Sequence, residues 1–467
     1  MGVTLPGAAG EVKENYEISN SLRFNDDDSP DLDITSADGN EDIWTWSAWI
    51  KRSTLKSSGE QFLFCGSSNG STNTEIKLQN DQFTYINFNG SSNNSYIRTN
   101  AKLRDTSAWY HLVCSIDMSQ STDTNRIKLY INGVHQTSLD QTTYASQNTD
   151  TYMNVNSGTH RIGADARTAS NYFDGYMTEV HFIDGTAKAQ TDFGEFDDNG
   201  VWIPKRYTGS HGTNGFFMQF KQTGTSANSS GIGADTSGND KHYTPANLAA
   251  QDITEDTCTN NFATLNPLAF GDNVGTLSEG NLKHTHNGGD SDVVSTIGIS
   301  NGKFYAEFKV ESDVSGRPAI AVYNDYDNGA TNYGSVNGSV LFLQDGRILV
   351  DNSSIGDFGS ISQNDIIQVA VDNDNGAIYI GQNGSYLNSG DPTSGSSRTG
   401  SVSNFTAGSV TCFIGTRANS NSFASANFGN PAFSISSGNN DGKYGNFEYA
   451  PPSGYYALCT KRLAEFG

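Results

Sequence analysis

The sequence predicts an all-β chain built as two antiparallel β-sandwich domains in tandem. Short runs of alternating apolar and polar residues recur along the chain, which is the pattern of half-buried strands. Polar turn sequences such as NGS and DNDNG separate these runs, and helical periodicity is nearly absent. The chain is rich in Gly and polar residues, but 25 Phe, 21 Tyr and 5 Trp indicate folded strands rather than disorder.

The first region, 16–222, contains a predicted β-hairpin at residues 111–134, where apolar and polar residues alternate. In RIKLYINGV, Ile127, Leu129 and Ile131 share one face, whereas Lys128 and Tyr130 share the other. Further strands are expected at WTWSAWI (44–50), FLFCG (62–66) and FTYINF (83–88).

The same layout returns in the second region, 263–467, where IIQVAVDNDNGAIYIGQNG (366–384) reads as another hairpin. Because identities between the two copies are few, we expect two related sandwich folds. The apolar faces of both hairpins serve packing, and Asp117 and Asp372 are expected to end strands and cap turns. Binding residues are expected where the copies differ, as in the longer MSQSTDTN loop of the first hairpin.

Two segments lie outside these regions. Residues 1–15 are expected to be an N-terminal arm, and residues 223–262 a Gly/Ser/Asn-rich connector. The length of the connector indicates that it packs on another part of the protein.

The composition excludes several classes of function. The net charge is −23, with 28 basic and 51 acidic side chains, which disfavours binding to nucleic acid or to anionic membranes. No signal-peptide core and no run of the roughly 20 apolar residues of a membrane helix occurs. Cys65, Cys114 and Cys412 lie in apolar strand-like runs, so we expect buried free thiols in a chain made in a reducing cytoplasm.

Particular stretches resemble known families. SLRFNDDDSPDLDI, WTWSAWIKR, WYHLVCSID, RIKLYINGV and YFDGYMTEVHFIDG resemble the laminin-G-like (concanavalin A-like) jelly roll. In the second region, GKFYAEFKV, DIIQVAVDNDNGAIYIGQNGSY, ANFGNPAF and FEYAPPSGYYALC resemble a SPRY-like sandwich. Both families are two-sheet antiparallel sandwiches, so the resemblance implies two jelly-roll-type domains.

A wider resemblance spans nearly the full chain. LPGAAGEV, SLRFNDDDSP, FGEFDDNGVWIPKRYTGSHGTNGFF, DTSGNDKHYTPANL and TNNFATLNPL together resemble tailed-phage virion proteins of the marine or cyanophage type. This implies a non-enzymatic tail fibre, or a capsid-attached fibre or decoration protein, made in the host cytoplasm and displayed on the phage particle. Its implied partners are host cell-surface polysaccharide and other virion proteins. A homo-oligomer is expected, with a trimer as the guess, because virion fibres are commonly trimers.

A glycan depolymerase, hydrolase or lyase, on the same fold is the alternative. Retaining hydrolases place two carboxylates close together, and their ExDxE-type pattern is absent here. The nearest approach is Glu307 and Glu311, which we interpret as a solvated strand end. His284 and His286 are expected to be exposed loop residues rather than zinc ligands.

Two loops carry the candidate sites. Sugar binding needs aromatic platforms beside amides and carboxylates, which the loop 321–335 offers; its candidate carbohydrate-binding residues are Tyr323, Asn324, Tyr326, Asn332 and Tyr333. INFNGSSNNSY (86–96) is a similar, weaker candidate. In DDDSPD, the candidate metal ligands Asp26, Asp28 and Asp31 suit Ca²⁺, and a charged β-turn is the competing interpretation. No other cofactor is predicted.

Overall fold

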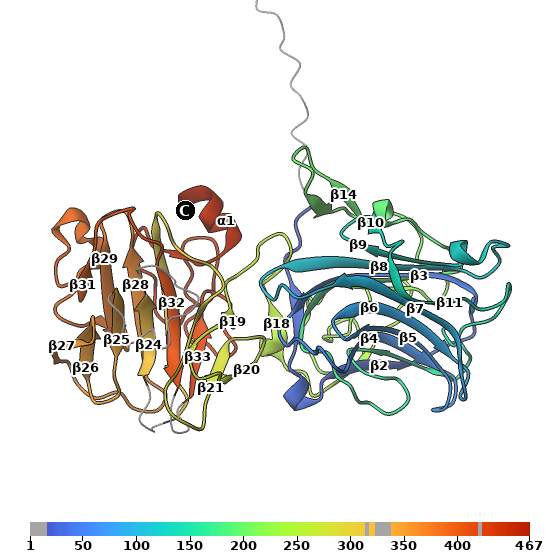
Figure 1. Ribbon diagram of the computed structural model, residues 1–467, viewed down its shortest axis with the longest axis horizontal. Helices are drawn as coiled ribbons and strands as arrows, with labels where there is room; N and C mark the ends of the chain where they lie inside the picture. The colour runs from blue at the N-terminus through green and yellow to red at the C-terminus, as the bar shows by residue number, and fades with distance from the viewer. Residues whose placement is uncertain (1–15, 313–316, 323–337, 419–422) are drawn as a thin grey trace, which may run out of the picture.

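The protein consists of two β-sandwiches that lie side by side (Figure 1). The computed structural model describes residues 16–312, 317–322, 338–418 and 423–467. The predicted all-β class with two antiparallel sandwiches is confirmed. In the described part of the chain, no helix has the length and apolar character needed to cross a membrane.

The first sandwich packs two antiparallel sheets face to face. One sheet has the order β10-β9-β8-β3-β13-β1-β18, with β16 also paired to β13. Its strands are β1 Ser21–Phe24, β3 Ile43–Arg52, β8 Trp109–Asp117, β9 Ile127–Ile131, β10 Val134–His135, β13 Gly175–Asp184, β16 Phe216–Met218 and β18 Ile253–Thr254. The other has the order β11-β7-β6-β5-β4-β12-β2-β17. Its strands are β2 Asp31–Thr35, β4 Glu60–Ser67, β5 Asn73–Gln79, β6 Gln82–Phe88, β7 Asn93–Lys102, β11 Leu139–Thr143, β12 Thr159–Ile162 and β17 Thr244–Ala246.

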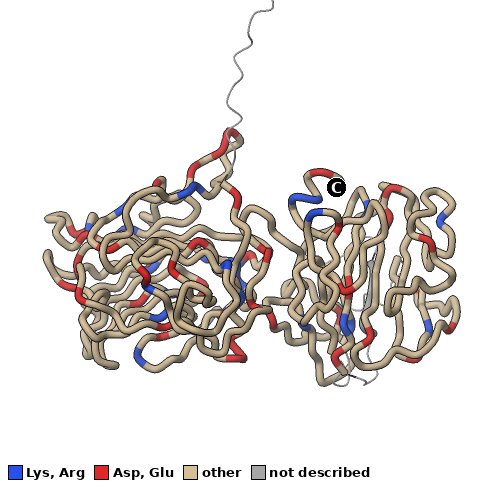
Figure 2. Tube along the Cα trace, turned by 180° about the vertical axis from the view of Figure 1, so that it is seen from behind, with Lys and Arg blue, Asp and Glu red and all other residues tan. Residues whose placement is uncertain are grey.

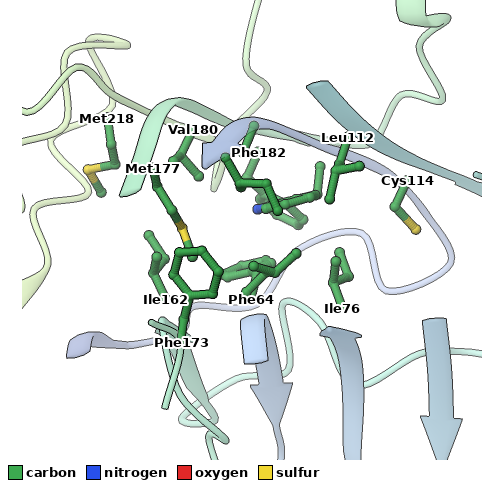
Figure 3. Packing of buried hydrophobic residues seen from close by; sticks show 14 of the residues in the cluster. Phe64, Ile76, Leu112, Cys114, Ile162, Phe173, Met177, Val180, Phe182 and Met218 are labelled. Atoms are coloured by element: carbon green, nitrogen blue, oxygen red, sulfur yellow. The ribbon is translucent and has the colours of Figure 1, made fainter. Parts of the chain in front are cut away.

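The core of this sandwich lies between the two sheets. Figure 3 shows Leu112, Met177 and Phe182 pointing from one sheet toward Phe64 and Ile76 on the other. All five side chains have no exposed surface. Because alternate residues of a strand face opposite sides, each of these strands turns its other side chains outward.

Both predicted hairpins form. In β8–β9, Leu112 pairs with Ile131 and Cys114 with Leu129, and these side chains belong to the first core. The second hairpin joins β28 Ile366–Asp372 to β29 Ala377–Gln382. The strand-ending aspartates cap turns, as predicted: Asp117 accepts a hydrogen bond from the Ser119 amide (3.1 Å), and Asp372 accepts one from the Asn375 amide (2.9 Å).

The second sandwich also has two packed sheets. The first has the order β19-β22-β32-β24-β25-β26-β27. Its strands are β19 Leu265–Asp272, β22 Ser291–Ser295, β24 Arg317–Val322, β25 Ser339–Phe342, β26 Arg347–Val350, β27 Ser353–Asp357 and β32 Phe413–Ala418. The other has the order β20-β21-β33-β23-β28-β29-β30, with β31 and β34 attached. Its remaining strands are β20 Thr276–Ser278, β21 Lys283–Thr285, β23 Lys303–Val310, β30 Ser385–Tyr386, β31 Ser403–Asn404, β33 Phe423–Asn427 and β34 Tyr456–Ala457, and a short helix α1, Thr460–Phe466, follows.

The segment 223–262, expected to be a connector, contributes to the first sandwich itself. Its β17 pairs with β2 at the edge of one sheet, and its β18 pairs with β1 at the edge of the other. Ile232, Tyr243 and Leu248 of this segment are buried in the first core. The polar composition of the segment did not indicate these strands, because only a few apolar side chains are needed to hold short edge strands.

A buried ion pair joins the segment 223–262 to the first sandwich, and neutral hydrogen bonds join the second sandwich to the first. The Lys51 ammonium lies 2.8 Å from Asp256 Oδ2 and donates to the Phe262 carbonyl (3.0 Å). Across the junction, the Tyr176 hydroxyl donates to the Gly280 carbonyl (2.9 Å) and the Asn281 side chain donates to the Ser53 carbonyl (3.0 Å). These contacts fix the two sandwiches relative to each other.

Candidate functional site

The five residues predicted to bind carbohydrate lie within 323–337, outside the described residues. The prediction for Tyr323, Asn324, Tyr326, Asn332 and Tyr333 therefore stays a prediction. The weaker candidate, 86–96, is the turn between β6 and β7. There Asn89 Oδ1 accepts the amides of Ser91 (3.0 Å) and Ser92 (2.9 Å), so this amide closes the turn.

The three aspartates predicted to bind calcium do not converge on one point. Asp26 Oδ2 lies 2.9 Å from Lys56 Nζ, and Asp28 Oδ2 accepts a hydrogen bond from Asn25 Nδ2 (2.8 Å). Asp31 begins β2 and pairs with Arg161 at 3.2 Å. Within the described ranges, no group of three or more His, Cys, Asp or Glu side chains is arranged to hold a metal ion. The structure thus supports the interpretation of DDDSPD as a charged turn.

Glu307 is buried, so its interpretation as part of a solvated strand end was wrong. Its carboxylate accepts hydrogen bonds from the Tyr305 hydroxyl (2.9 Å) and Asn427 Nδ2 (3.2 Å). It also accepts the backbone amides of Glu448 (2.9 Å) and Tyr449 (2.7 Å). Two of these donors belong to the C-terminal segment, Asn427 belongs to the neighbouring strand β33 and Tyr305 to β23 itself, so Glu307 holds that segment to the sheet. Its oxygens have no room for a substrate.

The pH dependence of stability tests this role of Glu307. Burial raises its pKa from 4.5 to about 7, against the hydrogen bonds that favour the ionised form. Between these values the folded protein binds more protons than the unfolded chain, so this group's stabilisation is present below pH 4.5 and is lost as pH rises through 7. We expect the stability difference between wild type and Glu307→Gln to change by about 3 kcal/mol over this window. Urea titrations at several pH values measure it, and a pH-independent difference would contradict the account.

His284 is likewise buried rather than exposed. It lies on β21, its Nε2 is 3.1 Å from Ser291 Oγ, and its ring packs 5.7 Å from that of Phe270. Burial lowers its pKa to about 3, so the ring is neutral at physiological pH. The local sequence HTH gives no sign of this because the covering residues come from other strands.

A polar groove lies on the outer face of the β8–β9 hairpin, beside the loop MSQSTDTN. It has a volume of about 330 Å³. Its lining comprises Ser115, Asp117, Gln120, Asn125, Lys128, Tyr130, Ala187, Lys188 and Ala189. Strand alternation explains why β9 lines the groove with polar side chains. Because Ile127, Leu129 and Ile131 face the core, the alternate residues Lys128 and Tyr130 face outward.

Hydrogen bonds fix the loop that forms one side of the groove. Asp117 accepts from the Ser119 hydroxyl (2.5 Å) and from Gln120 Nε2 (2.6 Å). Buried Arg126 donates to the carbonyls of Gln120 (2.8 Å) and Ala145 (2.6 Å). The groove is therefore preformed, which lowers the entropic cost of binding.

The opposite side is held to the sheet in the same way. The Lys188 amide donates to Thr45 Oγ1 on β3 (2.7 Å), and Thr45 in turn donates to the Thr186 carbonyl (2.9 Å). This wall comes from the segment after β13, so it joins the hairpin only in the folded protein.

The charges of the groove contrast with those of the whole chain. Figure 2 shows Asp and Glu spread over both sandwiches, with Lys and Arg in the minority. The lining of the groove, however, contains two lysines, Lys128 and Lys188, and a single carboxylate, that of Asp117. Burial acts to raise the pKa of Asp117, but hydrogen bonds from Ser119 and Gln120, together with Lys128, outweigh it and leave that pKa below its usual value. Asp117 is thus ionised and already hydrogen-bonded.

An aromatic ring completes the groove. Tyr130 is half-buried, and its ring packs 5.1 Å from the His135 ring and against a small cluster that includes Val113 and Ile183. Its remaining surface lines the groove beside the exposed Asn125 amide. An apolar platform flanked by amides and ammonium groups suits a polyhydroxylated ligand that carries negative charge. With one carboxylate in its lining, the groove lacks the carboxyl pair of a glycoside hydrolase.

Residues 26–191, which include the whole groove, match the laminin G family model described as the concanavalin A-like lectin/glucanases superfamily. Over these residues the first sandwich is similar to a concanavalin A-like jelly roll. No curated protein matches the sequence.

The chain is distantly similar to several solved structures. The SPRY domain of human HERC1 is 14% identical with a TM-score of 0.27, over 35% of this chain and 96% of that one. A carbohydrate-binding protein candidate from Bacteroides ovatus is 13% identical with a TM-score of 0.34, over 51% of this chain and 60% of that one. Domains LG4–5 of the mouse laminin α1 chain are 9% identical with a TM-score of 0.32, over 86% of this chain and 82% of that one.

Sequence reasoning found part of this groove. It singled out the MSQSTDTN loop, and it placed Lys128 and Tyr130 on the face opposite the core. It missed the wall at residues 187–189 because no local pattern connects that segment with the hairpin. The signal that could have pointed there is the lysine in TAKAQ, directly after a long buried strand.

Proposed function

We propose that this protein is a non-enzymatic carbohydrate-binding protein whose concanavalin A-like jelly roll takes an acidic oligosaccharide in the β8–β9 groove. One observation carries the proposal: the preformed groove combines a tyrosine face, amides and two lysines around a carboxylate that is already satisfied. The match of residues 26–191 to a superfamily that contains lectins supports it.

The lysines set the expected ligand class. Lys128 acts electrostatically on Asp117, and Lys188 Nζ lies 5.9 Å from the centre of the Tyr207 ring. A uronate or sulfate group on a sugar would pair with these ammonium groups, and such charge-assisted hydrogen bonds are stronger than neutral ones. A neutral oligosaccharide of the same length would lack that gain.

Titration calorimetry with oligomannuronate as the acidic probe tests the proposal. We expect Lys128→Gln to weaken oligomannuronate binding about tenfold, which corresponds to about 1.4 kcal/mol. Tyr130→Ala should weaken it by a similar factor through loss of the platform. Lys102→Gln, which removes an exposed lysine on β7, is the matched control and should leave binding unchanged. If Lys128→Gln and Lys102→Gln changed the affinity for oligomannuronate equally, the groove would be ruled out as its binding site.

A second measurement separates binding from depolymerisation. Incubation of the protein with polymannuronate should release no new reducing ends, because the groove supplies one carboxylate and lacks the pair that glycoside hydrolysis needs. A non-enzymatic binding protein should also release no unsaturated sugars. Time-dependent release of either product would establish the depolymerase alternative.

The full-length resemblance to tailed-phage proteins supports a place for this activity on the virion, as a fibre or decoration protein that contacts host surface polysaccharide. On this proposal, the polypeptide is a structural component of purified particles, in a homo-oligomeric form. Mass spectrometry of purified virions tests it, and absence of the polypeptide from infectious particles would contradict it.

A further inference from the structure

A second groove lies between the two sandwiches, away from the β8–β9 hairpin. It has a volume of about 390 Å³, within the range of about 300–1,000 Å³ typical of small-ligand sites. The first sandwich contributes Asn20 and the segment 250–255, and the second contributes residues 429–435 and Asn446. Domain junctions are common places for ligand sites.

The lining contains a buried amide that lacks a partner. Asn430 is 5% exposed, and its Oδ1 accepts the backbone amide of Glu255 at 3.3 Å. Its Nδ2, in contrast, is buried without a hydrogen-bond partner. An unpaired buried donor is costly, so a ligand hydroxyl that accepted from Nδ2 would gain the full value of that hydrogen bond. The Glu255 amide holds this donor in place.

The rest of the lining has the chemistry of a neutral polyol site. Asn20, Asn446 and Glu255 add amide and carboxylate groups, of which Asn446 and Glu255 are exposed. Phe433 and Pro431 supply apolar surface, and Lys309 Nζ lies 5.8 Å from the centre of the Phe433 ring. Among the described residues that line this groove there is no lysine or arginine. A negatively charged ligand would therefore meet Glu255 without a compensating cation.

Buried Arg23 fixes the two walls relative to each other. Its guanidinium donates to the Gln251 carbonyl (3.1 Å) and to Asp252 Oδ1 (3.1 Å) on one side. On the other it donates to the Pro431 carbonyl (3.4 Å). The groove thus keeps its width in the absence of ligand, and little conformational entropy is lost on binding.

We propose that this inter-sandwich groove is a second carbohydrate site, specific for neutral oligosaccharides, in which Asn430 Nδ2 and the Glu255 carboxylate bind hydroxyl groups beside Phe433. It does not depend on the β8–β9 groove, and it differs from that groove in the charge of the ligand it selects.

Titration calorimetry of the full chain with cellotriose, maltotriose and laminaritriose tests this site. At least one of these neutral trisaccharides should bind, and Asn430→Ala and Glu255→Gln should each weaken it about fivefold or more. Asp198→Asn removes one exposed acidic charge from the turn between β14 Gly194–Phe196 and β15 Trp202–Pro204, and is the matched control. It should leave binding unchanged.

Two results would overturn the proposal: no binding of any of the three trisaccharides, or equal affinity for them in Glu255→Gln and wild type. Because Glu255 is exposed, Glu255→Gln remains decisive if Asn430→Ala lowers the melting temperature. Loss of oligomannuronate binding in Lys128→Gln concerns the first groove alone, so the two proposals fail separately.

Discussion

Replacement of Lys51 by Met should destabilise the first sandwich by about 3–5 kcal/mol, because it leaves the carboxylate of Asp256 buried without its counter-charge. Both side chains are at most 1% exposed. Lys51 also donates to Asn261 Oδ1 (2.7 Å), and Asp256 Oδ1 accepts from Trp109 Nε1 (3.2 Å). The pair therefore holds the segment 253–262 to β3 and β8.

Tryptophan fluorescence during urea unfolding measures this effect selectively. All five tryptophans lie in the first sandwich, at Trp44, Trp46, Trp49, Trp109 and Trp202. Lys51→Met with Asp256→Asn should be less destabilised than Lys51→Met alone, since it removes the uncompensated charge. Lys102→Met, at an exposed site, should change stability by less than about 0.5 kcal/mol. If the two lysine variants unfolded at the same urea concentration, the buried pair would have no such role.

Glu307→Ala should destabilise the second sandwich by about 3 kcal/mol or more, because it leaves four hydrogen-bond donors without an acceptor. Two of them are the amides of Glu448 and Tyr449, in the C-terminal segment that covers this sheet. The others are the Tyr305 hydroxyl and the Asn427 amide. Far-UV circular dichroism during urea unfolding, compared with the tryptophan signal of the first sandwich, isolates the transition of the second.

Glu311→Ala is the matched control on the same stretch of chain. Glu311 is half-buried, accepts from Ser425 Oγ (2.9 Å) and lies 3.5 Å from Lys309 Nζ. Its loss should cost about 1 kcal/mol. Equal costs for the two glutamates would mean that Glu307 is as solvated as its local sequence suggested.

The hairpins could be predicted from strand alternation because the residues on each face of a strand recur at every second position. Ile127, Leu129 and Ile131 are buried together, and so are Ile367, Val369 and Val371. Local pattern is sufficient here, since a strand that faces a core on one side must alternate.

Contacts between distant segments carried no such signal. The short β17 and β18 lie in a polar stretch, and their place at the sheet edges depends on β2 and β1, more than 200 residues earlier in the chain. Glu307 and His284 were expected to be exposed because the residues that cover them lie far away in sequence. Buried polar residues of this kind are recognised by their partners rather than by their neighbours in sequence.

The sequence likewise predicted only part of the β8–β9 groove. The sequence identified the MSQSTDTN loop and the outward direction of Lys128 and Tyr130, which follow from strand alternation. Lys188 could not be assigned to the groove, since only the pairing of β13 with β3 brings it to the hairpin. The inter-sandwich groove had no sequence signal, because its two walls are about 180 residues apart in the chain.

The central claim is that the β8–β9 groove binds an acidic oligosaccharide, and a crystal structure of the chain with oligomannuronate tests it most directly. The account predicts a sugar ring on Tyr130 with its carboxylate within hydrogen-bond distance of Lys128 Nζ or Lys188 Nζ. An oligomannuronate bound elsewhere, with this groove empty, would contradict it.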